Sequence, residues 1–202
     1  MLDERCVYLA AVLNLTGSAS YVVATLKGRA RPNKVSYFVW TLASLIAFGA
    51  ELGQGVGIQS VMTLMFGLGP AMIFMASFAN SQAYWRVTRF DLVCGGMSVV
   101  ALGVWIGAGQ GTAAIALTII ARALGAVPTV IKSYRHPRTE SPWVFWLGAV
   151  SAAITILTID TWDFAHFGFP AYVLAICGLL AALITFRIGE RTKAPVTTIQ
   201  TR

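Results

Sequence analysis

The sequence predicts an all-α transmembrane protein of seven helices. Three observations lead to this fold class: an apolar composition, seven long apolar segments and a sequence pattern that occurs twice. Of the 202 residues, 57% are hydrophobic and only 11% are charged, and the mean hydropathy is +0.72. A soluble domain carries about 25% charged residues. Because so few polar residues cannot cover a globular surface, we expect the outside of the protein to face lipid.

Seven apolar segments are long enough to cross the hydrocarbon core of a bilayer, which takes roughly 20 residues of helix. They cover about residues 6–26, 36–55, 57–80, 91–109, 111–133, 142–159 and 169–187. Only "GQGVG" separates the second segment from the third, and only "GAGQG" separates the fourth from the fifth, so both connections are predicted to be tight turns. The acidic start "MLDER" and the length of the first segment argue against a cleavable signal peptide.

The basic residues indicate an orientation in the membrane. If the N-terminus is outside, every one of the 15 Lys and Arg residues except Arg5 and Arg122 falls in an inner connection or in the C-terminal segment. Positive residues stay on the cytoplasmic side during insertion. The sequence therefore predicts an outer N-terminus and an inner C-terminus. The net charge of +7 is explained by these basic inner connections, so anionic lipid head groups and not nucleic acid are the expected partners.

One pattern of basic, proline and aromatic residues occurs twice, as "KGRARPNKVSYFVW" at 27–40 and "KSYRHPRTESPWVFW" at 132–146. Both copies lie at the predicted inner side, and an even number of spans separates them, so the two copies have the same orientation. We therefore expect two parallel three-helix units joined by a linker helix, a 3+1+3 architecture with a pseudo-twofold axis along the membrane normal. Its predicted parts are a first repeat at 1–80, a linker helix at 81–110, a second repeat at 111–188 and a cytoplasmic tail at 189–202.

The stretches "GRARPNKVSYFVW", "TRFDLVC" and "ALGAVPTVIKSYRHPRTESP" resemble a bacterial branch of the PQ-loop superfamily, which includes the SWEET sugar facilitators. The resemblance implies the 3+1+3 fold, hinge prolines and a bacterial inner membrane. Pro128 in the fifth span and Pro142 at the start of the sixth match hinge positions of that family. Thr129 follows Pro128, so the Pro-Gln pair is absent, and Asn80 lies only at the inner end of the third span. The resemblance therefore carries the fold and not sugar specificity.

Polar residues recur at helical spacing in four spans and predict the lining of a central path. A polar group in hydrocarbon needs a partner or a cavity, although small and hydroxylated residues also serve helix packing. Trp146 fits a membrane-interface belt equally well. The predicted substrate-binding residues are Asn14, Tyr21, Trp40, Ser44, Glu51, Thr118, Arg122, Trp146, Ser151 and Thr155. The predicted hinges are Pro128, Gly125 and Gly17.

Arg122 is the most informative of these residues because it lies near the middle of the fifth span. An arginine at that depth costs about 2.5–3.5 kcal/mol on insertion scales, and more when it faces lipid. We predict that Glu51 of the second span forms an ion pair with it. The alternatives are a water-filled cavity or an anionic substrate group facing Arg122.

The sequence holds little that indicates an enzyme, a metal site or a cofactor. Cys6, Cys94 and Cys177 lie in or at the edges of spans without CxxC spacing, so neither a disulfide nor a metal site is predicted. HExxH, GxSxG and P-loop motifs are absent from the sequence, and the last span lacks the lysine that a retinal protein needs. Asp160, Asp163 and His166 are expected in an outer loop, either solvated or forming a gate.

These observations lead us to expect a facilitator or secondary transporter of a small polar solute, sugar-like or another small metabolite, that works by alternating access. A receptor, regulator or assembly subunit built on the same fold is the alternative. The expected partners are a small-molecule substrate and the lipid bilayer, and a second copy of the chain stays a candidate partner.

Overall fold

A computed structural model of the chain describes residues 2–79, 86–108 and 112–191. These residues form seven long helices, the short turn η2 and the short helix α8, without a strand among them. The long helices are α1 (Cys6–Leu26), α2 (Lys34–Gly53), α3 (Ser60–Ala79), α4 (Arg89–Ala108), α5 (Thr112–Arg135), α6 (Pro142–Leu157) and α7 (Phe164–Thr185), with η2 at Pro137–Thr139 and α8 at Ile188–Arg191. Each predicted apolar segment corresponds to one long helix. Asn80, residues 109–111 of the predicted "GAGQG" turn and most of the predicted tail lie outside the described residues.

Five of the described helices, α1, α2, α3, α5 and α7, are long and apolar enough to cross a membrane, and α6 is a shorter apolar helix of 16 residues. Several apolar helices of this kind are the mark of an integral membrane protein. The predicted class of an all-helical membrane protein is therefore confirmed.

Two of the helices that begin earlier than predicted, α2 and α7, are each capped by a polar residue. The side chain of Asn33 accepts hydrogen bonds from the backbone N–H groups of Val35 and Ser36, so α2 begins at Lys34. Asp163 accepts from the backbone N–H of His166 at 3.0 Å, so α7 begins at Phe164. Such caps satisfy N–H groups that a helix leaves unpaired at its first turn.

The cap at Asp163 corrects the predicted outer loop. His166 does not lie in that loop but in the first turn of α7, where its Nδ1 is 2.7 Å from Asp163 Oδ1. These hydrogen bonds from His166 lower the pKa of the Asp163 carboxyl below its ordinary value. The pair fixes the start of α7 at the surface. Asp160 remains in the connection before it.

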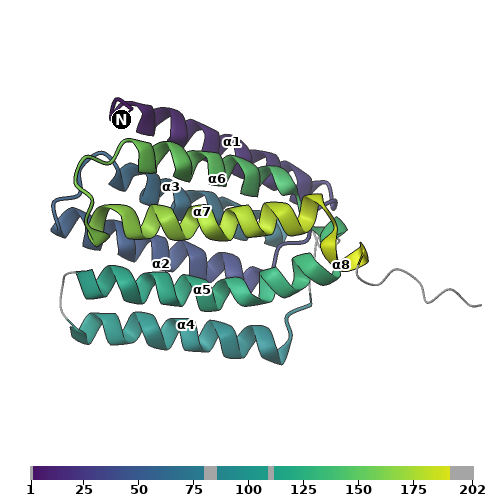
Figure 1. The fold of residues 1–202 in the computed structure, drawn as a ribbon. Helices are drawn as coiled ribbons and strands as arrows, with labels where there is room; N and C mark the ends of the chain where they lie inside the picture. Colours follow the sequence, from purple (N-terminus) through teal and green to yellow (C-terminus); the bar gives the residue numbers. More distant parts are fainter. Residues whose placement is uncertain (1, 80–85, 109–111, 192–202) are drawn as a thin grey trace, which may run out of the picture.

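Six helices contact one another in the order α1, α3, α2, α5, α7, α6 and back to α1, and α4 lies at one edge (Figure 1). We call α1–α3 the first group of helices and α5–α7 the second. In the first group α3 contacts both α1 and α2, and in the second α7 contacts both α5 and α6. The groups meet along two interfaces, α1 against α6 and α2 against α5. α4 packs mainly on α5 and to a lesser extent on α2. The space between the groups is therefore enclosed by helices that are distant in the sequence.

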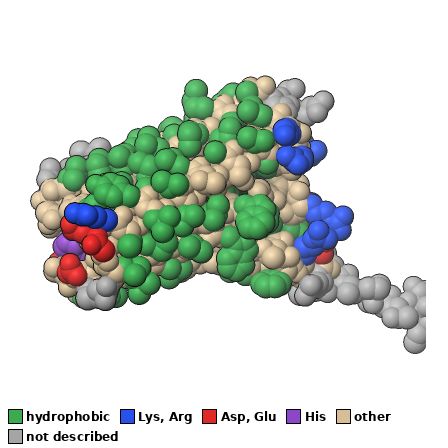
Figure 2. Space-filling view, turned by 90° about the horizontal axis from the view of Figure 1, so that it is seen from above, with side chains coloured by type: hydrophobic (Ala, Val, Ile, Leu, Met, Phe, Trp, Pro, Cys, Tyr) green, Lys and Arg blue, Asp and Glu red, His purple; other side chains and the backbone are tan. Residues whose placement is uncertain are grey.

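The surface divides into an apolar flank and two polar ends. Figure 2 shows hydrophobic side chains along the length of the bundle and most of the visible Lys and Arg side chains at one end. At the other end, Asp, Glu and His side chains lie beside a smaller basic group. On α4, for example, Leu92, Val93 and Val100 are each more than half exposed, as lipid-facing residues would be. We call the end that carries the connections 27–33, 86–88 and 136–141 the basic end. The end that carries the connections 54–59 and 158–163 is the opposite end.

Candidate functional site

Arg122 lies in the interior of the bundle on α5, and its guanidinium contacts α2. Only 3% of the residue is exposed. Nη1 donates a hydrogen bond to the backbone oxygen of Trp40 at 2.8 Å and another to Ser44 Oγ. In return, the indole Nε1 of Trp40 donates to the backbone oxygen of Arg122 at 3.2 Å. The two helices are thus joined by a reciprocal pair of contacts at the level of Arg122.

Aromatic rings surround the rest of the guanidinium. Its central carbon is 5.2 Å from the ring centre of Phe169 and 6.0 Å from those of Trp40 and Tyr172. Cation–π contacts stabilise a cation by about 0.5–1 kcal/mol at exposed sites and by about 2 kcal/mol or more where the cation is desolvated. Nε has no hydrogen-bond partner among the described residues, and no carboxylate in that part of the chain pairs with Arg122. The positive charge is therefore solvated by dipoles and rings but not neutralised.

The predicted ion pair between Glu51 and Arg122 is wrong in this structure. Glu51 is 2% exposed, and its Oε1 accepts a hydrogen bond from Thr63 Oγ1 of α3 at 3.0 Å. Glu51 lies two turns beyond Ser44 on α2, about 10 Å along the helix axis. Arg122 instead bonds to α2 at the level of Ser44, so its guanidinium does not reach the depth of the Glu51 carboxylate. Oε2 of Glu51 has no partner among the described residues.

A cavity of about 40 Å³ opens beside Arg122 between the two groups of helices. Its lining includes Asn14 and Ser18 of α1, Trp40 of α2, Pro70 of α3 and Arg122 itself. A water molecule needs about 10–15 Å³ measured in this way, so the cavity has room for a few waters. Sites for small-molecule ligands are typically about 300–1,000 Å³. In this conformation the cavity is therefore too small for a solute of metabolite size.

Asn14 brings an unused polar group to this cavity. The residue is 4% exposed, and its Oδ1 has no hydrogen-bond partner among the residues that the structure describes. Gly69 of α3 approaches from the other side: a β-carbon there would overlap Ser18 Oγ and lie 3.4 Å from Asn14 Oδ1. Buried polar atoms are nearly always paired with protein or water. The lining of the cavity therefore includes an amide side chain on α1 as well as a cation on α5.

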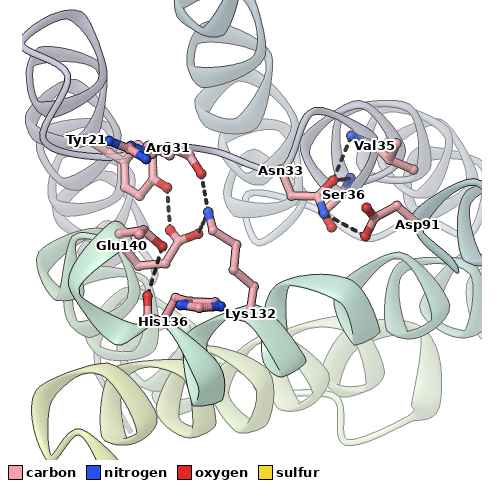
Figure 3. A network of polar contacts seen from close by, with 10 residues as sticks. Tyr21, Arg31, Asn33, Val35, Ser36, Asp91, Lys132, His136 and Glu140 are labelled. Carbon is pink, nitrogen blue, oxygen red and sulfur yellow. Dashed lines mark hydrogen bonds and ion pairs between the residues drawn. The ribbon is translucent and has the colours of Figure 1, made fainter. Parts of the chain in front are cut away.

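A second polar cluster lies at the basic end and joins the two groups of helices (Figure 3). Lys132, near the end of α5, forms an ion pair with Glu140, with Nζ 2.6 Å from Oε1, and both side chains are fully buried. Nζ of Lys132 also donates to the backbone oxygen of Arg31, and the hydroxyl of Tyr21 donates to Oε2 of Glu140. We call Tyr21, Arg31, Lys132 and Glu140 the basic-end network. It joins α1 and the connection 27–33 to α5 and the connection 136–141.

A neighbouring contact ties α4 to the same region. Nδ2 of Asn33 donates to Asp91 Oδ1 at 2.9 Å, while Asp91 Oδ2 accepts from the backbone and hydroxyl of Thr88 at 2.6 and 2.9 Å. Asn33 is therefore both the cap of α2 and the partner of α4 (Figure 3). Asp91 and Glu140 were not predicted as site residues. The available signal was a single acidic residue in each of two otherwise basic segments.

Some of the predicted site residues meet at the cavity, and others do not. Asn14, Trp40, Ser44 and Arg122 converge, although Ser44 is there as a partner of Arg122 and also donates to the Phe66 backbone oxygen. Tyr21 belongs to the basic-end network, and Thr118 bonds within its own helix to the oxygen of Ile115. These positions follow from contacts between helices that spacing within one helix does not report.

The sixth helix departs most from the prediction. Trp146 is not a cavity residue: it is 40% exposed and donates to Thr185 Oγ1 at 3.0 Å on the outside of the bundle. Ser151 donates to the backbone oxygen of Ala10 at 2.7 Å and so joins α6 to α1. Thr155 bonds to the oxygen of Ser151. The contacts of Ser151 and Thr155 therefore favour a role in helix packing over a role in lining a central path.

The predicted hinge glycines lie where helices approach closely. A β-carbon at Gly17 would be 3.2 Å from the Val144 backbone of α6, and one at Gly125 would be 2.7 Å from Val39 Cγ1 of α2. Close packing thus accounts for both glycines, and their hinge role stays a prediction. Pro128 is buried inside α5, where it removes a backbone hydrogen bond of the helix. Prolines also lie inside α3 and α7, at Pro70 and Pro170.

Comparison of the chain with protein-family models, curated proteins and solved structures finds no match.

Proposed function

We propose that the chain is a facilitator or secondary transporter of a small polar solute. The observation that carries this proposal is the cavity inside the bundle, whose mainly apolar lining includes the unneutralised cation of Arg122 and the polar side chains of Asn14 and Ser18. Ionisable residues within membrane spans are costly and typically mark solute or ion pathways. A bundle that only needed to be stable would gain by having apolar residues at both positions.

The small size of the cavity supports a mechanism of alternating access. Because about 40 Å³ cannot hold a metabolite, a solute can enter only if the helix groups move apart. The basic-end network crosses between the groups and would have to open on one side of the membrane. Pro128, Gly125 and Gly17 are the proposed hinges for this movement. The state described here is then a closed one at the basic end.

We further propose the 3+1+3 arrangement of a PQ-loop or SWEET-like protein. The packing supports it, because the third helix of each group, α3 or α7, lies between the other two. The contacts between the groups support it too. A twofold rotation that places the first group on the second would place α1 on α5 and α2 on α6. The interface of α1 with α6 would then correspond to that of α5 with α2. α4, at the edge, would be the linker. The two copies of the repeated sequence lie at the same end of the bundle.

The proposed orientation places the basic end in the cytoplasm of a bacterium. A reporter that is active only in the periplasm should work when it is inserted after residue 56 or 160 and fail after residue 30 or 136. The physical reason is the retention of Lys- and Arg-rich connections on the cytoplasmic side. The measurement is reporter activity normalised to the amount of fusion protein. The opposite pattern of activity would reverse the orientation.

Transport itself is tested by uptake into proteoliposomes with a panel of sugars, amino acids and small organic acids. We expect at least one solute to enter faster than into empty liposomes. The matched variants are Gly69→Ala and Gly178→Ala, the first in α3 and the second in α7. A methyl group at Gly69 displaces Ser18 at the cavity, whereas one at Gly178 meets nothing within 4 Å. Gly69→Ala should therefore slow uptake and Gly178→Ala should not.

Absence of uptake for the whole panel would favour the alternative, a receptor, regulator or assembly subunit on the same fold. Equal slowing by the two glycine variants would separate transport from this cavity.

A further inference from the structure

The charge of Arg122 has no counter-charge in the part of the chain that the structure describes. Its Nη1 is occupied by the Trp40 carbonyl and by Ser44, its Nε is unpaired, and the one carboxylate predicted to reach it, that of Glu51, bonds to Thr63. An uncompensated charge in a low-dielectric interior is strongly unfavourable. An anion at the cavity would remove that penalty.

We propose that the cavity binds a small organic carboxylate, with Arg122 as its counter-ion. Arginine holds carboxylates through charge-assisted hydrogen bonds that are roughly twice as strong as neutral ones. This inference deepens the proposed function and rests on it for the route by which the solute reaches the cavity. Binding requires the helix groups to separate far enough to admit the carboxylate, but it does not require passage across the membrane.

The rest of the lining favours an organic anion over an inorganic one. Beside Arg122 and Asn14 the cavity is walled mainly by apolar side chains, among them Phe66, Ile73 and Phe145. Sulfate or phosphate would leave oxygen atoms against these walls without hydrogen-bond partners, which is costly. A carboxylate presents its oxygens on one side and a carbon chain on the other. The chain can then contact the apolar wall while the oxygens contact Arg122.

Asn14 provides the second polar contact. Its side-chain amide is part of the lining, and an amide can accept from or donate to a hydroxyl or amino group next to the carboxylate. Arg122 and Asn14 lie on α5 and α1, which belong to different groups of helices. A solute that contacts both would therefore bridge the two groups.

The first test needs only the unaltered chain. Purified protein in lipid nanodiscs is heated while its tryptophan fluorescence is followed, with chloride progressively replaced by acetate, propionate or lactate at constant ionic strength. Acetamide, propionamide and lactamide serve as neutral partners of nearly the same shape. A ligand that binds the folded state raises the melting temperature. We expect at least one acid to raise it saturably, and its amide to require at least about tenfold higher concentrations.

An equal effect of acid and amide would overturn the inference, and so would the absence of a shift with all three acids. An unchanged melting temperature would also be seen if chloride occupied the cavity as well as the carboxylates do. That result too would contradict a preference for an organic anion.

The second test uses variants. Arg122→Gln should abolish the preference for acid over amide, and Arg122→Lys should retain part of it because it keeps the charge. Arg138→Gln is the control, since it removes a positive charge from an exposed residue that pairs with Glu190 at the surface. It should leave the preference unchanged. If Arg122→Gln does not fold, Arg122→Lys and the comparison of acids with amides still decide the question. A preference that persists in Arg122→Gln would assign the anion to another site.

The two proposals fail differently. Binding of a carboxylate without any uptake into proteoliposomes would support this inference and contradict the transport function. Uptake of a neutral solute, without discrimination of acid from amide, would do the reverse.

Discussion

Replacing Glu140 by Gln is expected to lower the free energy of unfolding by about 3–5 kcal/mol, the usual cost of leaving one member of a buried ion pair without its partner. Both side chains of the Lys132–Glu140 pair are fully buried, so water cannot take over the role of the lost carboxylate. The measurement is the thermal or denaturant-induced unfolding of the chain in nanodiscs. A loss below about 1 kcal/mol would mean that the pair behaves like a solvated one.

Two further variants separate charge from hydrogen bonding at this site. Tyr21→Phe removes only the hydroxyl that donates to Glu140, and should cost about 1.5–3 kcal/mol, the usual range for a hydrogen bond to a charged group. The double variant Lys132→Met with Glu140→Met removes both charges, and should recover part of the loss seen in Glu140→Gln. If the double variant is as unstable as Glu140→Gln, the hydrogen bonds to Arg31 and Tyr21 matter more than the charge. A stable double variant also allows opening of the basic end to be measured without unfolding.

Exchanging the charges of Glu51 and Arg122 is expected to produce a protein less active and less abundant than either single variant. In the double variant Glu51→Arg with Arg122→Glu, a carboxylate would face the Trp40 carbonyl and the Ser44 hydroxyl, where the arginine now donates. An arginine at position 51 would meet Thr63 on the other helix. Neither new charge gains a counter-charge. The measurements are membrane abundance and the melting-temperature response to carboxylates.

If the double variant were more active or more abundant than the single variants, the protein would have to adopt a second conformation besides the one described here. This would mean that the helices slide by about two turns, roughly 10 Å, to bring the two positions together in that conformation. Glu51→Gln is the informative control, because it keeps an acceptor for Thr63. We expect it to be the mildest of these changes.

The sequence by itself determined the class of the protein and the order of its helices. Apolar segments of about 20 residues can cross a bilayer only as helices, because no water is present to satisfy the backbone. The turns between the second and third segments and the repeated basic stretch were also visible. Arg122 was identified because a charge at mid-span is costly wherever it points. Each of these features depends on the residues of one continuous stretch of chain, and can therefore be read without knowing how the helices pack.

Only the tertiary structure decided which residues meet. Arg122 bonds to Trp40 and Ser44 and not to Glu51, since depth, rotation and tilt of two helices together set which turns face one another. Glu140 and Lys132 looked like loop charges, and became a buried pair only because Tyr21 and the Arg31 carbonyl of the other helix group close over them. Trp146 looked like Trp40 but lies on the outer face of α6. Helical spacing reports which residues share a face, whereas the neighbour of that face is a property of the folded bundle.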